Sequence, residues 1–196
     1  MVTALCAALC LTIVALVLQG ADVRGTDAAL KMTARFSFLL FWPAYSAGAI
    51  ATLFGPRFAV FRRRARDFGL AFASAHLVHI GLVVWLCYIG AAPSSQTFTF
   101  FGIAVLWTYL LALLSIDRLH RAVGRIGWAL LSVVGLNYIA FAFAVDFMRF
   151  PLRGDATYLL GYLPFVVLAI AGPILRLAAG GLRVYQILRN SASPAH

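Results

Sequence analysis

Long runs of apolar residues alternate with short polar segments along the whole chain. A helix rises 1.5 Å per residue, so about 20 residues cross the hydrocarbon core of a bilayer. Most of the apolar runs are close to that length, and we expect each to form a membrane-spanning helix. The pattern predicts six spans, at residues 2–18, 36–54, 68–90, 97–115, 126–147 and 156–175.

The segments between these runs are polar and are expected to lie outside the hydrocarbon core. Residues 19–35 carry charges of both signs and are interpreted as a polar connection. Residues 55–67 and 116–125 are interpreted as basic loops, and residues 91–96 as an uncharged turn. The basic tail from Arg176 has apolar residues spaced to lie along the membrane surface.

Composition supports the same interpretation. The chain is 63% hydrophobic and 11% charged, whereas an average soluble domain is about 25% charged. A chain of 196 residues with so few charges cannot cover a water-facing surface. We therefore expect one all-α integral membrane domain over residues 1–196, built as a bundle of six transmembrane helices.

The positive charges give this bundle an orientation. Eleven Lys and Arg residues lie in segments 55–67, 116–125 and 176–196, and five lie on the opposite side. The positive-inside rule then places both termini in the cytoplasm of a bacterial inner membrane. A cleaved signal peptide is the competing interpretation of the first run; the missing basic n-region opposes it, and alanines near Ala21 leave it open.

A formal net charge of +10 also raises the possibility of nucleic-acid binding. The arginines, however, stand at the ends of apolar runs, where they meet anionic lipid headgroups. The chain lacks the interleaved basic and aromatic residues that bind single strands. The expected partner is the lipid bilayer, and no nucleic acid is expected.

Two histidines interrupt the third apolar run. His76 and His79 follow Arg66 by ten and thirteen residues, or about 15 and 20 Å of helix. Both therefore fall near the middle of a hydrocarbon core about 30 Å thick, and on one face of the helix. Ionisable residues at that depth are expensive and mark candidate functional sites.

These histidines allow two interpretations. Each is either a neutral imidazole that hydrogen-bonds inside the bundle, or an axial ligand of a haem iron, as in haem-binding helix bundles. Ligands on opposite faces of a porphyrin must come from different helices, so His76 and His79 cannot share one iron. Asn137 lies at a depth similar to that of His79 and is suited to hydrogen-bond an imidazole.

Several motifs resemble the ferric reductase-like transmembrane domain family. Gly55-Pro56, the arginine cluster and the segment DFGLAFASAHLVH ending at His79 follow the family order. The nearest likeness is to its short bacterial branch, the haem-binding membrane subunit of the periplasmic methionine sulfoxide reductase system (MsrQ type). The resemblance covers roughly residues 36–140.

The resemblance implies b-type haem with His79 as a ligand to the iron. Leu119-His120-Arg121 matches the start of the second family motif, which makes His120 a further candidate, along with His76. Asn137-Tyr138 stands where the family has a histidine followed by an aromatic residue. The family would also imply a cytoplasmic or quinol electron donor and a periplasmic redox partner.

Three functions follow as hypotheses. The first is a haem b electron-transfer subunit, which would be part of an oxidoreductase rather than a complete enzyme. The second is a cofactor-free accessory or structural membrane subunit of the same fold. The third is a small transporter or sensor in which His76 and His79 respond to protons.

Overall fold

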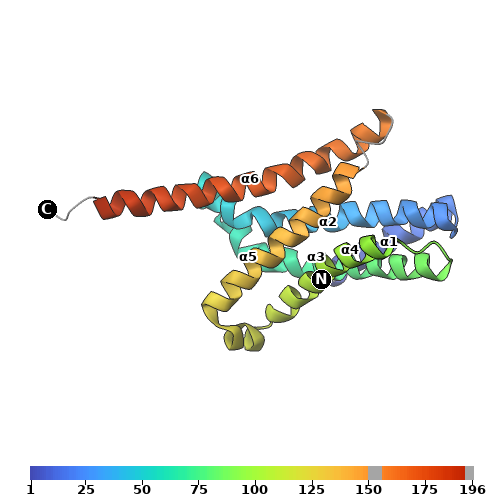
Figure 1. Ribbon diagram of the computed structural model, residues 1–196, viewed down its shortest axis with the longest axis horizontal. Coiled ribbons are helices and arrows are strands. Elements are labelled where there is room, and N and C mark those ends of the chain that lie inside the picture. The colour runs from blue at the N-terminus through green and yellow to red at the C-terminus, as the bar shows by residue number, and fades with distance from the viewer. Residues whose placement is uncertain (150–155, 193–196) are drawn as a thin grey trace.

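The computed structural model describes residues 1–149 and 156–192, which are helical apart from short turns. The helices follow one another along the chain with a single 3₁₀ turn, η1, after the second (Figure 1). Six of them are long and apolar enough to cross a membrane, which confirms the all-α architecture and the number of spans. Their bounds are α1 Val2–Gln19, α2 Val23–Phe54, η1 Pro56–Phe58, α3 Ala59–Tyr88, α4 Ser95–Leu114, α5 Asp117–Arg149 and α6 Ala156–Ala192.

The predicted polar connection at 19–35 is wrong, because α2 already begins at Val23. Asp22 caps the helix, and its side chain accepts a hydrogen bond from the Gly25 amide at 2.9 Å. Lys31 and Asp27, four residues apart, form an ion pair on the same helix. The charges lie on one face of this first part of α2, and small residues on the other face are buried.

The two basic loops are also shorter than predicted. Between α2 and α3 the chain turns at Gly55, where φ is 85°, and through η1, so that most of the arginines of 55–67 belong to α3. The segment 116–125 is helical from Asp117 and is broken by non-helical dihedral angles at Gly124. The predicted surface-lying tail continues α6 to Ala192, and Figure 1 shows it running on beyond the other helices.

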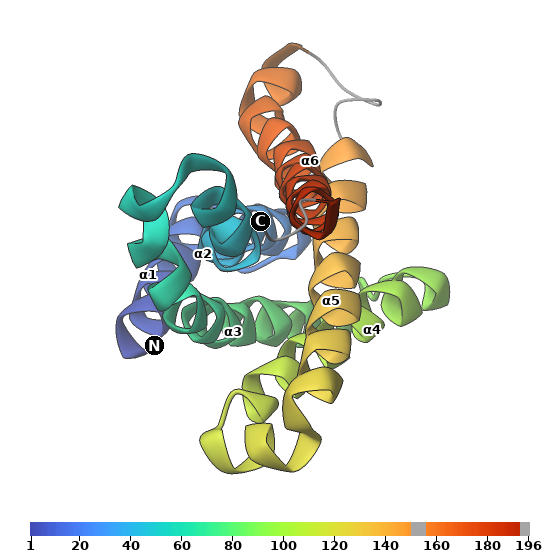
Figure 2. The same ribbon diagram turned by 90° about the vertical axis from the view of Figure 1, so that its left-hand side faces the viewer.

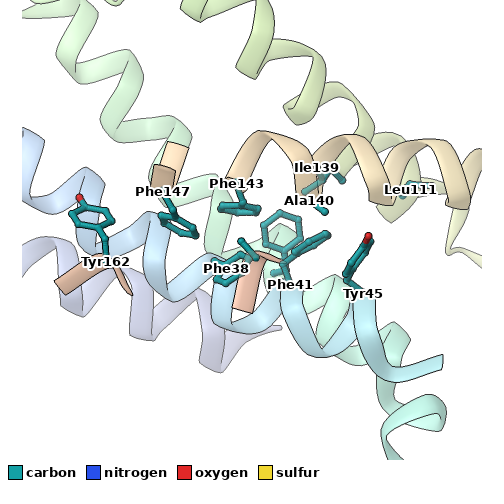
Figure 3. Close-up of a cluster of buried hydrophobic side chains, with 11 residues drawn as sticks. Phe38, Phe41, Tyr45, Leu111, Ile139, Ala140, Phe143, Phe147 and Tyr162 are labelled. Carbon is teal, nitrogen blue, oxygen red and sulfur yellow. The ribbon is translucent and has the colours of Figure 1, made fainter. Parts of the chain in front are cut away.

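Helix α2 lies at the centre of the packing, in contact with α1, α3, α5 and α6 (Figure 2). A cluster of aromatic rings forms the core between α2 and α5, as Figure 3 shows. The Phe38 ring lies 5.2 Å from the Phe143 ring and 4.9 Å from the Phe147 ring, between centroids. Offset and edge-on ring contacts of this kind add about 0.5–1.5 kcal/mol each beyond burial.

Helix α4 packs mainly against α5 and touches α3 over a smaller area. Helices α4 and α5 approach each other closely at Gly135 of α5. A larger residue would not fit there, because its Cβ would lie 2.6 Å from a ring carbon of Trp107. The α4–α5 pair is thereby held together while space remains between it and α3. That space is divided into two cavities, which hold the features discussed below.

Candidate functional site in the bundle interior

A cavity of about 420 Å³ lies between α3 and the α4–α5 pair, with α2 and α6 at its edge. His76 and His79 of α3 both line it, and we call it the histidine cavity. Small-molecule and cofactor sites commonly have volumes of about 300–1,000 Å³. The two histidines singled out in the sequence are therefore placed together at a hollow of suitable size for a ligand.

The imidazole of His79 is held by Thr33 of α2, with 3.0 Å between Nδ1 and the threonine Oγ1. The Thr33 hydroxyl lies 2.9 Å from the carbonyl oxygen of Ala29 and 3.1 Å from that of Leu30, and donates its proton there. It must then accept from His79, so we assign the proton of His79 to Nδ1. The lone pair of the ring is left on Nε2.

His76 stands beside His79 in a different environment. The two rings stack with centroids 5.0 Å apart and planes at 13°. The Phe72 ring lies 5.3 Å from His76 on the other side. The Nδ1 atom of His76 is buried and, among the described residues, has no hydrogen-bond partner. His79 is thus the oriented histidine of the pair, and His76 is held by ring contacts.

The walls of the histidine cavity are hydrocarbon and its edge is charged. Aliphatic and aromatic residues of α3, α4 and α5 form the walls: Phe72, Ile80, Val83, Phe101, Val105 and Phe143. Asp27 and Lys31 of α2, with Asp146 of α5 and Tyr162 of α6, line one end. An amphipathic ligand with an apolar body and a charged end fits this distribution.

The structure does not bring Asn137 to His79. Asn137 accepts a hydrogen bond from the hydroxyl of Tyr45 at 2.7 Å and donates one to the carbonyl of Val133 at 2.7 Å. It does not line the histidine cavity. Residue 120 belongs to the part of α5 before the break at Gly124, and the His120 side chain lies outside the described part of the structure.

Equal depth in the membrane does not predict that Asn137 lies near His79. Depth gives the position of a residue along a helix and leaves the direction of its side chain around the helix undefined. The residues of α5 that face the cavity are Ile139, Ala142, Phe143, Asp146 and Phe147. With 3.6 residues per turn, Asn137 points to a different side of α5 from this set. It meets α2 at Tyr45 instead.

Thr33 is the functional residue that the sequence reasoning missed. It fell in the segment interpreted as a polar connection, which was expected to lie outside the hydrocarbon core. A signal was present: Gly25, Ala29, Thr33 and Ser37 recur every four residues, and all four are buried. Small residues at that spacing form a packing face on a helix.

Among the described residues, no group of three His, Cys, Asp or Glu side chains is placed to hold a metal ion. In the described part of the site, His79 therefore supplies one oriented nitrogen ligand, and the side chains around it do not complete the coordination of a metal ion. Comparison with protein-family models, with curated proteins and with solved structures gave no significant match.

Proposed function

We propose that this chain is a haem b electron-transfer subunit of a bacterial inner membrane, in which Nε2 of His79 would bind the iron. The observation that carries the proposal is the Thr33–His79 contact of 3.0 Å at the histidine cavity. A hydrogen bond from the far ring nitrogen to an acceptor is the usual support of a metal-binding histidine, fixing its tautomer and orientation.

The residues of the cavity fit one axial ligand to a haem. The described residues of α4 and α5 that line the cavity offer hydrocarbon, the hydroxyls of Thr97 and Thr108 and the carboxylate of Asp146, and none of them is His, Met or Cys. Apolar walls suit a porphyrin. Among the described residues that line the cavity, His79 is the one that would hold the iron.

A bound haem would supply one-electron reduction and oxidation, and the protein side chains would set its surroundings. Thr33 fixes the His79 ring and raises the basicity of its ligating nitrogen. The apolar walls keep water away and lower the local dielectric, which bears on the reduction potential. The ring of His76 packs between those of His79 and Phe72 and occupies the space next to His79.

The likeness to the ferric reductase-like family supports a direction for electron flow. An electron would arrive from a cytoplasmic donor or a quinol and leave to a periplasmic redox partner. On this proposal the chain acts as the membrane part of an oxidoreductase, the role that the family resemblance implies.

A dithionite-reduced minus oxidised spectrum tests this function. Protein made under haem-replete conditions and purified in mild detergent should give Soret and α-band changes. Replacing His79→Ala should abolish them, whereas His120→Ala should leave them. A wild-type protein that shows no such bands would refute the proposal.

The cofactor-free accessory subunit is the second candidate. It is favoured by one observation. His79 lines the cavity, and the described residues of α4 and α5 that also line it offer no second nitrogen or sulfur ligand. In that case Thr33 and His79 are a hydrogen-bonded pair that joins α2 to α3. A wild-type protein without haem bands, together with a lower melting temperature in His79→Phe from loss of this hydrogen bond, would favour this candidate.

A further inference from the structure

A second cavity, also of about 420 Å³, lies at the arginine-rich end of α3, between α3 and the α4–α5 pair. Arg66 lines it, and we call it the arginine cavity. Phe72, Thr108 and Ile139 line both cavities and form the partition between them. We propose that the arginine cavity binds an anionic phospholipid, with the headgroup at Arg66 and an acyl chain inside.

The hollow results from small residues on facing helices. Ala44 of α2, Ala65 and Gly69 of α3 and Ala112 of α4 all line it, and a Cβ at Gly69 would lie 3.9 Å from that of Ala44. Larger apolar residues close the remaining walls: Phe41, Leu70, Leu111, Leu136 and Ile139. A slot with hydrocarbon walls inside a bundle of membrane-compatible helices is suited to a lipid chain.

The hydroxyl groups inside this slot are already engaged. Thr108 donates to the carbonyl of Ala104 at 2.8 Å, Ser115 to that of Leu111 at 2.8 Å, and Ser132 to that of Trp128 at 2.6 Å. They have no proton left for a ligand. A sugar or nucleotide, which needs many polar partners, would therefore be poorly satisfied here.

One end of the slot is cationic and interfacial in character. Arg66 is exposed at this end, and Trp128 lines the cavity with it. Tryptophan is enriched at membrane–water interfaces, and basic pockets between transmembrane helices bind anionic headgroups.

These features together specify the ligand class. It must carry a negative charge at one end, because Arg66 is there, and hydrocarbon at the other, because the slot is apolar and its hydroxyl protons are engaged. A phospholipid such as phosphatidylglycerol satisfies both conditions. A free phosphate ester satisfies only the first, so the two sources can be separated by experiment.

Native mass spectrometry of the full chain, released from detergent after incubation with phosphatidylglycerol or phosphatidylcholine, measures this binding. Wild-type protein should retain phosphatidylglycerol in preference to phosphatidylcholine. Arg66→Gln should weaken retention about fivefold, the effect of one arginine near an anionic lipid. Arg64→Gln is the matched control, since Arg64 is exposed on α3, lies two residues away on another face, and does not line the cavity.

A second variant tests the slot independently of charge. Ala112→Phe should fill the space and reduce retention with every arginine intact, provided that circular dichroism and gel filtration match wild type. If that variant is misfolded, Ser132→Leu serves the same purpose from α5. Three results would overturn the proposal: equal retention of both lipids, equal losses in Arg64→Gln and Arg66→Gln, or displacement of the lipid by glycerol 3-phosphate alone.

Discussion

The Thr33 hydroxyl determines which nitrogen of His79 is available to a ligand. Its proton is directed to the backbone carbonyls of Ala29 and Leu30, so toward the imidazole it acts as an acceptor. Removing the hydroxyl would free the ring to rotate and to exchange tautomers. Retaining it in a shorter side chain would preserve the same contact.

This reasoning predicts different outcomes for two substitutions at position 33. Thr33→Val keeps the shape and removes the acceptor, and should weaken haem binding by about 10–100-fold, as loss of a support to a metal ligand commonly does. Thr33→Ser should remain near wild type. Haemin titration followed at the Soret band measures both, and equal affinities for Val and Ser would contradict the assigned role of Thr33.

His76 can be separated from His79 by a ring-for-ring replacement. His76→Phe preserves the ring contact with Phe72 and removes a buried Nδ1 that has no partner among the described residues. An unsatisfied buried polar group costs about 1–3 kcal/mol, so this variant should melt at or above the wild-type temperature. It should also keep the haem bands; if they disappear in His76→Phe and persist in His79→Ala, the ligand is His76.

At the scale of helices, the hydrophobic pattern predicted the existence of each element better than its ends. The apolar runs were sufficient to predict six helices because each has the length and hydropathy of a span. The sequence does not predict the start of α2, because the charges of Arg24, Asp27 and Lys31 are typical of an aqueous segment. In the folded chain these side chains share a helix whose other face is small and buried.

Gly25 gives a test of the first part of α2. A Cβ at this position would lie 1.7 Å from the carbonyl oxygen of Gly20, so Gly25→Ala must displace the turn between α1 and α2. We expect a loss of about 1–3 kcal/mol, as for other overpacked sites. Thermal unfolding in detergent measures the change.

Gly48 is the matched control on the same helix. A Cβ there has no heavy atom within 4 Å, so Gly48→Ala should be neutral or stabilise the protein by about 0.5–1 kcal/mol. Equal melting temperatures for the two variants would show that the tight turn before α2 is absent.

At the scale of the whole molecule, the sequence could not provide the directions in which helix faces point. The three-residue spacing predicts that His76 and His79 share one face of a helix, and their rings do stack. The pairing of His79 with Asn137 was only an argument from depth, and Asn137 instead contacts Tyr45. Which faces meet depends on packing among α2, α3 and α5, which hydropathy does not encode.

The orientation in the membrane remains a prediction from charge. The positive-inside rule places the turn at 91–96 in the periplasm and the end of α6 in the cytoplasm. A green fluorescent protein fusion after residue 189 should fluoresce, and an alkaline phosphatase fusion at residue 93 should be active. The reverse pattern would invert the topology and with it the proposed direction of electron flow.

The most direct test of the central claim is the iron–histidine stretching band in the resonance Raman spectrum of the reduced protein. If His79 holds the iron, wild type should show this band and His79→Ala should lose it. Thr33→Val should shift the band, since the hydrogen bond to Nδ1 changes the basicity of the ligand. A spectrum without the band, or a band that persists unchanged in His79→Ala, would contradict the account.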